Sequence, residues 1–264
     1  MLSLIRISVM LVVGLAIYIR FFENRLVFYP DKTVSNTPGV GFEHIQFAAS
    51  DGIRLHGWYI PFDNSTRVFL VSHGNAGNIG DRAIMGDFLH REFRENVFMY
   101  DYRGYGQSEG QPSEAGLYSD IRGAVAYLRS RGFDSKSIYL IGQSLGTAAT
   151  VDFANQELVG GIILEAPFPS VRAVARRFLL SVPLDYVMKA RFDSIAKVNG
   201  IHAPIVVIHA TADPVISYEL GRTLFDAVTG PKKLFTVPEA VHEGALMSLS
   251  ASSIHEIRVF LGIS

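Results

Sequence analysis

The residues with the clearest chemical potential are the five from Gly142 to Gly146, which read Gly-Gln-Ser-Leu-Gly. They follow an apolar run that ends at Ile141 and precede a stretch with helical spacing. A serine between two such glycines is typical of a sharp strand-to-helix turn, where side chains two residues away on either side would clash. Such a turn raises the Ser144 hydroxyl above a sheet, where it can act as a nucleophile. The alternative is a tight turn whose serine only caps a helix.

A serine nucleophile needs a general base, and the base needs a carboxylate that orients it. In the chain order known for this turn, the acid and then the histidine follow the serine. Of the 8 histidines, only His202, His209, His242 and His255 come after Ser144. We predict His242 as the base, because it alone of these four lies in a loop after the last predicted strand.

Asp213 is the predicted acid, because it follows the apolar run 204–209, in the loop after the penultimate strand. A carboxylate in that loop can reach a histidine that follows the neighbouring strand. Glu165, which comes after the preceding strand, is the alternative acid. If it is not the acid, we expect it to be a charged anchor at the start of the cap that residues 168–200 are expected to form.

Two backbone amides are expected to stabilise the negative charge that develops on the substrate oxygen. The amide of Leu145, in the first turn of the predicted helix, is one donor. The glycine-rich loop 73–78 supplies the amide of Asn75 or Ala76 as the other, and we assign Asn75. His73 is predicted to brace this loop. No cofactor and no metal is expected, because the sequence has neither a metal-ligand spacing nor a complete dinucleotide fingerprint.

From residue 42 on, short apolar runs flanked by turn residues alternate with segments of helical spacing. The first two runs are joined by Ser50–Gly52, a hairpin signal, and strand–helix alternation follows. This order predicts a mostly parallel, doubly wound sheet of eight strands with helices on both faces. Ligands bind at the carboxyl ends of such strands, which is where the candidate residues fall. The predicted strands are 43–48, 53–60, 68–72, 96–100, 137–141, 161–164, 204–209 and 233–237, and the predicted helices are 79–93, 114–130, 145–156, 218–228 and 245–260.

The N-terminal segment carries an uncharged apolar stretch, Ile7–Ile19, between Arg6 and Arg20. Residues 2–22 just reach the roughly 20 residues that cross a membrane if both arginines extend to the interfaces. We predict a single-pass N-terminal membrane anchor, with a cleaved signal peptide and a soluble amphipathic helix as alternatives. The charges on its two sides are nearly balanced, so they do not indicate the side of the membrane. The predicted parts of the chain are an anchor (1–22), a linker or surface strap (23–41) and a folded domain (42–264).

Residues 168–200 interrupt the alternation between the sixth and seventh strands, where we expect a short cap over the nucleophile. Arg172, Arg176 and Arg177 stand there beside apolar runs such as Phe178–Leu180. One interpretation is an amphipathic lid that lines an acyl pocket or rests on anionic lipid. The other is a solvated helix whose apolar side only covers the sheet, and the sequence does not decide between them.

The composition excludes several classes of protein. The 264 residues, of which 48% are hydrophobic and 19% charged, suit one large folded domain rather than a disordered chain. With 24 basic and 25 acidic residues the net charge is −1, which argues against a dedicated nucleic-acid binder. A cysteine count of 0 excludes a disulfide scaffold, a cysteine nucleophile and a thiolate metal site. The oligomeric state is not indicated.

Taken together, these motifs resemble the Bem46-like group of α/β-hydrolases. The resemblance rests on the loop 73–78, the turn 142–146, the loops of Asp213 and His242 and, above all, the run from residue 101 to residue 114. It implies an α/β-hydrolase fold, the same three catalytic residues and an N-terminal anchor. Members of the group include membrane-anchored serine hydrolases, and animal relatives include protein depalmitoylases. This chain has no cysteine, so its own palmitoylation cannot attach it to a membrane as it does the depalmitoylating relatives.

The sequence therefore predicts a membrane-anchored serine hydrolase that cleaves carboxylic esters or thioesters through an acyl-enzyme intermediate. The expected partners are the membrane and a small-molecule, lipid or acylated-protein ester. Amide or peptide hydrolysis by the same three residues is the alternative within this class. A non-catalytic, membrane-tethered binding protein is the alternative outside it.

Overall fold

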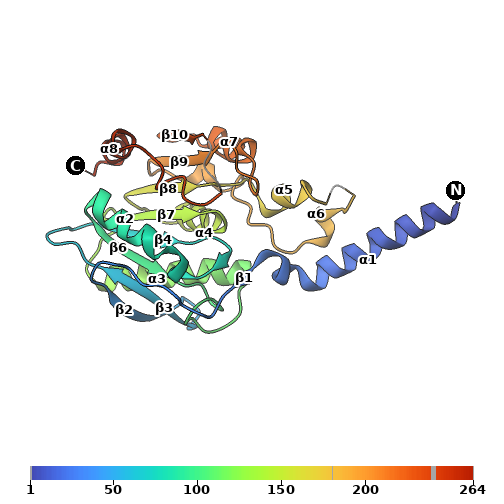
Figure 1. Ribbon diagram of the computed structural model, residues 1–264, viewed down its shortest axis with the longest axis horizontal. Helices are drawn as coiled ribbons and strands as arrows, with labels where there is room; N and C mark the ends of the chain where they lie inside the picture. The colour runs from blue at the N-terminus through green and yellow to red at the C-terminus, as the bar shows by residue number, and fades with distance from the viewer. Residues whose placement is uncertain (1, 180, 239–241, 264) are drawn as a thin grey trace.

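All eight predicted strands form in the computed structural model, and they pair into one sheet in the order β10-β9-β8-β7-β4-β6-β3-β2. The two pairs β2–β3 and β3–β6 are antiparallel, and the remaining pairs are parallel. Figure 1 shows the sheet with helices on both sides. The strands are β2 (Glu43–Ala48), β3 (Arg54–Ile60), β4 (Val68–Ser72), β6 (Asn96–Tyr100), β7 (Ile138–Gln143), β8 (Gly161–Glu165), β9 (Ile205–Ala210) and β10 (Lys232–Val237).

The structure describes residues 2–179, 181–238 and 242–263, and the side chains of its first helix at residues 6, 7 and 10–27. Leu180, in a predicted apolar run, and residues 239–241, in the predicted loop of His242, lie outside this part. So do residues 1 and 264, at the two ends of the predicted domains.

Side chains alternate along the central strands between two apolar cores. Leu70 and Leu140 belong to one core, and Phe69 and Ile141 to the other. Because both faces of each central strand are buried, helices must cover the sheet from both sides. The helices α3 (Glu114–Ser130), α4 (Leu145–Ala154) and α7 (Tyr218–Ala227) contribute to the first core, and α2 (Ala83–Phe93) and α8 (Ala251–Phe260) contribute to the second.

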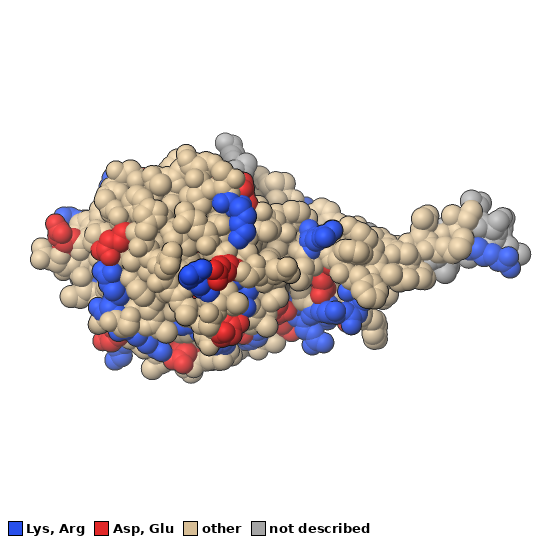
Figure 2. Space-filling model, turned by 90° about the horizontal axis from the view of Figure 1, so that it is seen from below, with Lys and Arg blue, Asp and Glu red and all other residues tan. Residues whose placement is uncertain are grey.

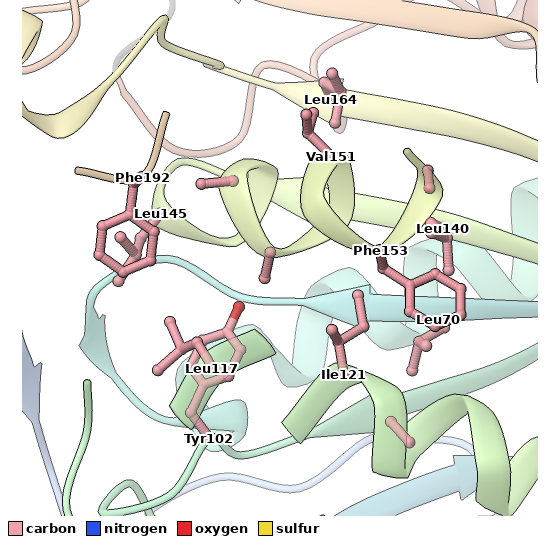
Figure 3. Close-up of a cluster of buried hydrophobic side chains, with 14 of the residues drawn as sticks. Leu70, Tyr102, Leu117, Ile121, Leu140, Leu145, Val151, Phe153, Leu164 and Phe192 are labelled. Atoms are coloured by element: carbon pink, nitrogen blue, oxygen red, sulfur yellow. The ribbon is translucent and has the colours of Figure 1, made fainter. Parts of the chain in front are cut away.

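The first core fixes the helix that begins at the nucleophile. Figure 3 shows Leu70 and Leu140 of the sheet beside Phe153 of α4 and Ile121 of α3. All four side chains are 2% exposed or less. Since α4 starts directly after Ser144, its packing in this core holds the nucleophile turn in place.

One predicted helix begins later than expected. The apolar spacing predicts a helix over 245–260, but α8 begins at Ala251. Ser250 caps it by accepting a hydrogen bond from the Ser253 amide. Before Ser250 the chain forms turns, and two of its amides donate to the Glu165 carboxylate instead of to a helical carbonyl. Apolar spacing alone does not distinguish a helix from a turn that is held by another segment.

The N-terminal helix α1 (Leu2–Val27) extends away from the sheet and continues beyond residue 22, where a linker was predicted. Its last turns are docked on the domain. The Glu23 carboxylate is buried and accepts hydrogen bonds from the amides of Lys189, at 2.7 Å, and Ala190, at 3.3 Å. Within the described part of the chain, no helix combines the length and the apolar character needed to cross a membrane.

The segment after α1 lies against the loop 73–78, which carries the predicted oxyanion donor Asn75 and which we call the oxyanion loop. Tyr29–Pro30 (β1) pairs in parallel with Ala76–Gly77 (β5) in a separate two-stranded sheet. The Tyr29 amide donates to the Asn75 carbonyl at 3.0 Å, and the Asn75 side chain donates to the Val27 carbonyl at 3.2 Å. The predicted linker or strap therefore supports the predicted oxyanion loop.

Residues 168–200, which we call the cap segment, connect β8 to β9 and lie beside the inner half of α1 (Figure 1). Their backbone is held by carboxylates from two helices. Glu23 of α1 accepts from amides 189 and 190, and Glu114 of α3 accepts from amides 191 and 192. The segment contains α5 (Val171–Arg176), α6 (Leu184–Val187) and the 3₁₀ helix η2 (Val198–Gly200); the other 3₁₀ helix, η1 (Ile79–Arg82), precedes α2.

Candidate active site

The structure brings Ser144, Asp213 and His242 together at the carboxyl edge of the sheet. The His242 Nε2 atom lies 2.9 Å from the Ser144 Oγ atom, and its Nδ1 atom lies 2.7 Å from the Asp213 Oδ2 atom. An ionised carboxylate only accepts hydrogen bonds, so Nδ1 carries the proton and Nε2 is free to accept one from the hydroxyl. In this geometry an imidazole can deprotonate a serine.

Ser144, the predicted nucleophile, occupies a strained turn, as the glycine spacing predicts. Ser144 has a φ of 50° and a ψ of −116°, a backbone conformation that costs roughly 1–3 kcal/mol for a residue with a side chain. A Cβ atom on Gly146 would lie 2.0 Å from the Ser72 carbonyl oxygen. One on Gly142 would lie 2.7 Å from the Thr147 Cα atom. Both glycines are therefore steric requirements of the turn.

Asp213 is oriented by its own loop. Its Oδ1 atom accepts hydrogen bonds from the amides of Val215, at 2.8 Å, and Ile216, at 2.9 Å, which leaves Oδ2 for His242. Burial raises the pKa of Asp213, but its hydrogen bond to His242, the charge of His242 and the two amides lower it by more. The net pKa lies below the ordinary value for aspartate. The carboxylate is thus ionised at neutral pH, as a group that stabilises an imidazolium must be.

Glu165, the alternative acid, holds the histidine loop instead. Its Oε1 atom accepts from the amides of Gly244, at 3.1 Å, and Leu246, at 2.9 Å. Its Oε2 atom accepts from the side chain of Gln143 at 3.0 Å, and burial raises its pKa. Among the described residues, Asp213 is the carboxylate that bonds to the imidazole, while Glu165 links the nucleophile turn to the loop of His242.

Leu145 and Asn75, the predicted oxyanion donors, line the same cavity as Ser144. The Leu145 amide lies in the first turn of α4, where amides have no partner within the helix. The Asn75 amide is oriented by His73, whose Nδ1 atom lies 2.7 Å from the Gly74 carbonyl oxygen. The Gly74 carbonyl and the Asn75 amide point in opposite directions because they share one trans peptide. The bond therefore turns the Asn75 N–H away from His73.

His73 is a neutral brace in this arrangement. Burial, reinforced by the nearby Arg82 charge, lowers the pKa of His73 to about 3. The Gly74 carbonyl can only accept, so the single proton of the neutral ring lies on Nδ1. The Tyr102 hydroxyl also donates to the His73 carbonyl at 2.8 Å, which fixes the start of the loop.

Arg82 also belongs to this site, although the sequence did not predict it. Its side chain is 5% exposed, and its guanidinium donates to the Ala76 carbonyl at 2.7 Å, to Gln143 Oε1 at 3.4 Å and to Glu243 Oε1 at 2.6 Å. One side chain thus connects the oxyanion loop, the nucleophile turn and the histidine loop. Arginines at helical positions are mostly exposed, so the sequence carries no signal for this role.

A cavity of about 490 Å³ opens beside Ser144, a volume that suits a small-molecule ligand. Its lining is mostly apolar, and most of its residues come from two segments that are far apart in the chain. Leu15 and Ile19 of α1 line one side, and Val174 and Leu179 of the cap segment line another.

Comparisons with known proteins agree with this fold. Residues 55–247 match the Alpha/beta hydrolase family. The uncharacterized protein YfhR of Escherichia coli (strain K12) is 33% identical, over 81% of this chain and 78% of that protein. The uncharacterized membrane protein YNL320W of Saccharomyces cerevisiae is 32% identical, over 86% of this chain and 84% of that protein. Among solved structures, the Pyrococcus furiosus esterase Pf2001 aligns with a TM-score of 0.71 and 17% identity, over 89% of this chain and 97% of that chain.

Proposed function

The chain belongs to the α/β-hydrolase family, and from this premise we propose that it is a serine hydrolase of carboxylic esters or thioesters. One observation carries the proposal: two hydrogen bonds link Asp213 to His242 and His242 to Ser144. The mostly apolar cavity beside the hydroxyl favours substrates with an acyl chain. The esterase activity named for the Pyrococcus furiosus neighbour agrees with this reaction class.

In the proposed reaction, His242 takes the proton of Ser144 while the Oγ atom attacks the acyl carbon. The amides of Leu145 and Asn75 stabilise the tetrahedral oxyanion. The imidazolium then donates its proton to the leaving alcohol or thiol, and the acyl group stays on Ser144. A water molecule, deprotonated by the same imidazole, attacks this acyl-enzyme. The imidazolium returns that proton to the Ser144 Oγ atom as the acid leaves.

We also propose that α1 attaches the enzyme to a membrane. Several of its apolar side chains are exposed; Met10, Leu11 and Phe21 are between 65% and 76% exposed. In Figure 2 the projecting helix is largely tan between basic groups near its tip and its base. Contiguous apolar surface of this kind is stabilised by transfer from water into lipid. The related Saccharomyces cerevisiae protein is described as a membrane protein.

A fluorophosphonate probe, which reacts with activated serines, tests the nucleophile. We expect labelling of the wild-type protein and of Ser135→Ala, a control in the turn that precedes β7, but not of Ser144→Ala. Ester and thioester hydrolysis should fall by at least about 10³-fold in Ser144→Ala only. Equal labelling of all three proteins would refute the assignment of Ser144. If the protein cleaves peptide amides but no esters or thioesters, its substrates are amides and the proposed substrate class is wrong.

Vesicle flotation of the full-length protein tests the attachment. Leu11→Glu and Phe21→Glu place charges on the exposed apolar side of α1, and each should weaken binding about tenfold or more. Leu158→Glu is the matched control, because Leu158 is 63% exposed but lies on the domain. Flotation of all these variants to the same extent as the wild type would contradict attachment through α1.

A further inference from the structure

We infer that the cavity beside Ser144 binds the acyl chain of the substrate and that α1 forms one of its walls, so that this helix helps to select the chain length. This inference rests on the proposed ester or thioester hydrolysis. It assigns α1 a place in the substrate-binding site in addition to membrane attachment.

One face of α1 is turned towards the cavity. Leu15, Tyr18, Ile19 and Leu26 all line it. Tyr18 and Ile19 come three and four residues after Leu15, and Leu26 comes seven after Ile19, which places the four on one side of a helix. Ile19 is 1% exposed, whereas Ile17, on another face of the same turn, is 55% exposed. From Leu15 to Leu26 the helix rises about 16 Å, long enough to follow an extended acyl chain.

The cap segment supplies the facing wall with the same periodicity. Two of its arginines bond within the segment: Arg172 bonds to the Met188 carbonyl, and both Arg172 and Arg176 pair with Asp185. The residues of the segment that line the cavity are all apolar. The residues of this wall are Val171, Val174, Ala175, Phe178 and Leu179.

The two walls converge on the nucleophile. Ser144, Leu145 and Asn75 line the same cavity as α1 and the cap segment. An ester carbonyl held by the amides of Leu145 and Asn75 would therefore have its acyl chain directed between two apolar surfaces. A chain bound there is removed from water, which is the main source of affinity for an apolar ligand.

The wall formed by α1 is held in a defined position. The buried Glu23 carboxylate binds the amides of Lys189 and Ala190 and thereby joins the helix to the cap segment. At the end of the helix, the Val27 carbonyl accepts from the Asn75 side chain. These bonds set the distance between the two walls, as a site that discriminates between chain lengths requires.

Two tryptophan substitutions on α1 separate the cavity face from the outer face. Leu15→Trp fills part of the cavity, and Ile17→Trp is the matched control on the exposed side. We expect Leu15→Trp to lower the ratio of kcat/KM for long-chain over short-chain p-nitrophenyl esters by about tenfold or more. Ile17→Trp should leave that ratio unchanged. Leu15→Ala should shift the preference towards longer chains.

Binding gives a readout that does not depend on hydrolysis. In the Ser144→Ala background, Leu15→Trp should weaken binding of dodecanoate about tenfold, and Ile17→Trp should not. If the two tryptophan variants have equal ratios of long-chain to short-chain kcat/KM and equal affinities for dodecanoate, the inference is wrong. Hydrolysis that depends on Ser144 would still support the proposed function in that case. If the wild-type protein hydrolyses no ester or thioester of the series, both the proposed function and the acyl site are refuted.

Discussion

The carboxylates of Glu165, the last residue of β8, and of Asp213, in the loop after β9, are both buried, yet they bond to different partners. Asp213 accepts hydrogen bonds from two backbone amides of its own loop and from the imidazole of His242. Glu165 accepts hydrogen bonds from two backbone amides in the loop of His242 and from the side chain of Gln143. One carboxylate therefore orients the ring itself, and the other orients the backbone that carries the ring.

This difference predicts unequal effects of two conservative amide substitutions. Asp213→Asn should lower kcat by about 10³- to 10⁴-fold, because the imidazole loses the acceptor that fixes its tautomer. Glu165→Gln should cost about tenfold or less, because its amide keeps one oxygen for the backbone amides of the loop. Steady-state kinetics on one ester, with thermal unfolding to verify folding, would measure both. The reverse order of effects would exchange the roles of the two residues.

The site residues that the sequence predicts share one property: each follows a strand at its carboxyl end. Ser144, Asp213 and His242 were chosen on that rule and on chain order, and the structure places them in contact. Arg82 follows no such rule. Its role depends on three loops that meet only in the folded protein, so local sequence cannot reveal it.

At the scale of the secondary-structure elements, Arg82 holds three loops in fixed positions relative to one another. Its guanidinium bonds to the oxyanion loop, the nucleophile turn and the histidine loop through a planar group with several donors. Lysine has the same charge but presents a single ammonium group, so it cannot reproduce all three contacts at once.

Arg82→Lys should therefore lower kcat by about ten- to a hundredfold, because small displacements of catalytic groups are costly. KM should change much less, since Arg82 does not line the cavity. Arg91→Lys is the control: Arg91 also belongs to this region of the chain, but its side chain is 68% exposed. Unchanged kcat in Arg82→Lys would show that the three loops hold their positions without it.

The strands were predictable because their signal is local. Each of the eight is a short apolar run bounded by turn residues, and each formed at the predicted place within two residues at either end. The start of α8 was predicted wrongly, because residues 245–250 have the spacing of a helix but form turns bonded to Glu165. That hydrogen bond joins residues about 80 positions apart in the sequence, so the local periodicity of residues 245–250 cannot predict it.

For the molecule as a whole, buried histidines make stability depend on pH. Burial, followed by the effect of His44, lowers the pKa of His56 in β3 to about 4. In the unfolded chain this ring takes up a proton below about pH 6.5, but in the folded protein it does so only near pH 4. The free energy of unfolding should therefore fall as the pH decreases from 6.5 to 4, by at most about 3 kcal/mol from this group.

Denaturant unfolding at several pH values would measure this contribution. His56→Gln removes the titrating ring, so the free energy of unfolding of the variant should vary less between pH 6.5 and 4 than that of the wild type. His255→Gln, at an exposed position of α8, should have the wild-type dependence. If His56→Gln and the wild type lose the same free energy over this range, His56 does not titrate as described.

The arrangement of the cavity could not be predicted from the sequence. The N-terminal stretch and residues 168–200 each contain recognisable apolar runs. In the sequence, however, the strands from β2 to β8 lie between them. Their facing positions follow from tertiary bonds such as Glu23 to Lys189. Local patterns therefore indicate that each segment is apolar, but only the folded structure shows that both line the same cavity.

The short parallel pair of β1 and β5 has a practical consequence for any shortened form of this protein. Tyr29 holds the Asn75 carbonyl, and the Tyr105 hydroxyl donates to the same oxygen at 2.8 Å. Cutting the chain after Pro30 would discard half of that support along with the projecting helix. Weak hydrolysis by such a fragment would then reflect a displaced amide at Asn75 as much as the loss of the proposed membrane attachment. A cut within the outer turns of α1 would leave the amide in place.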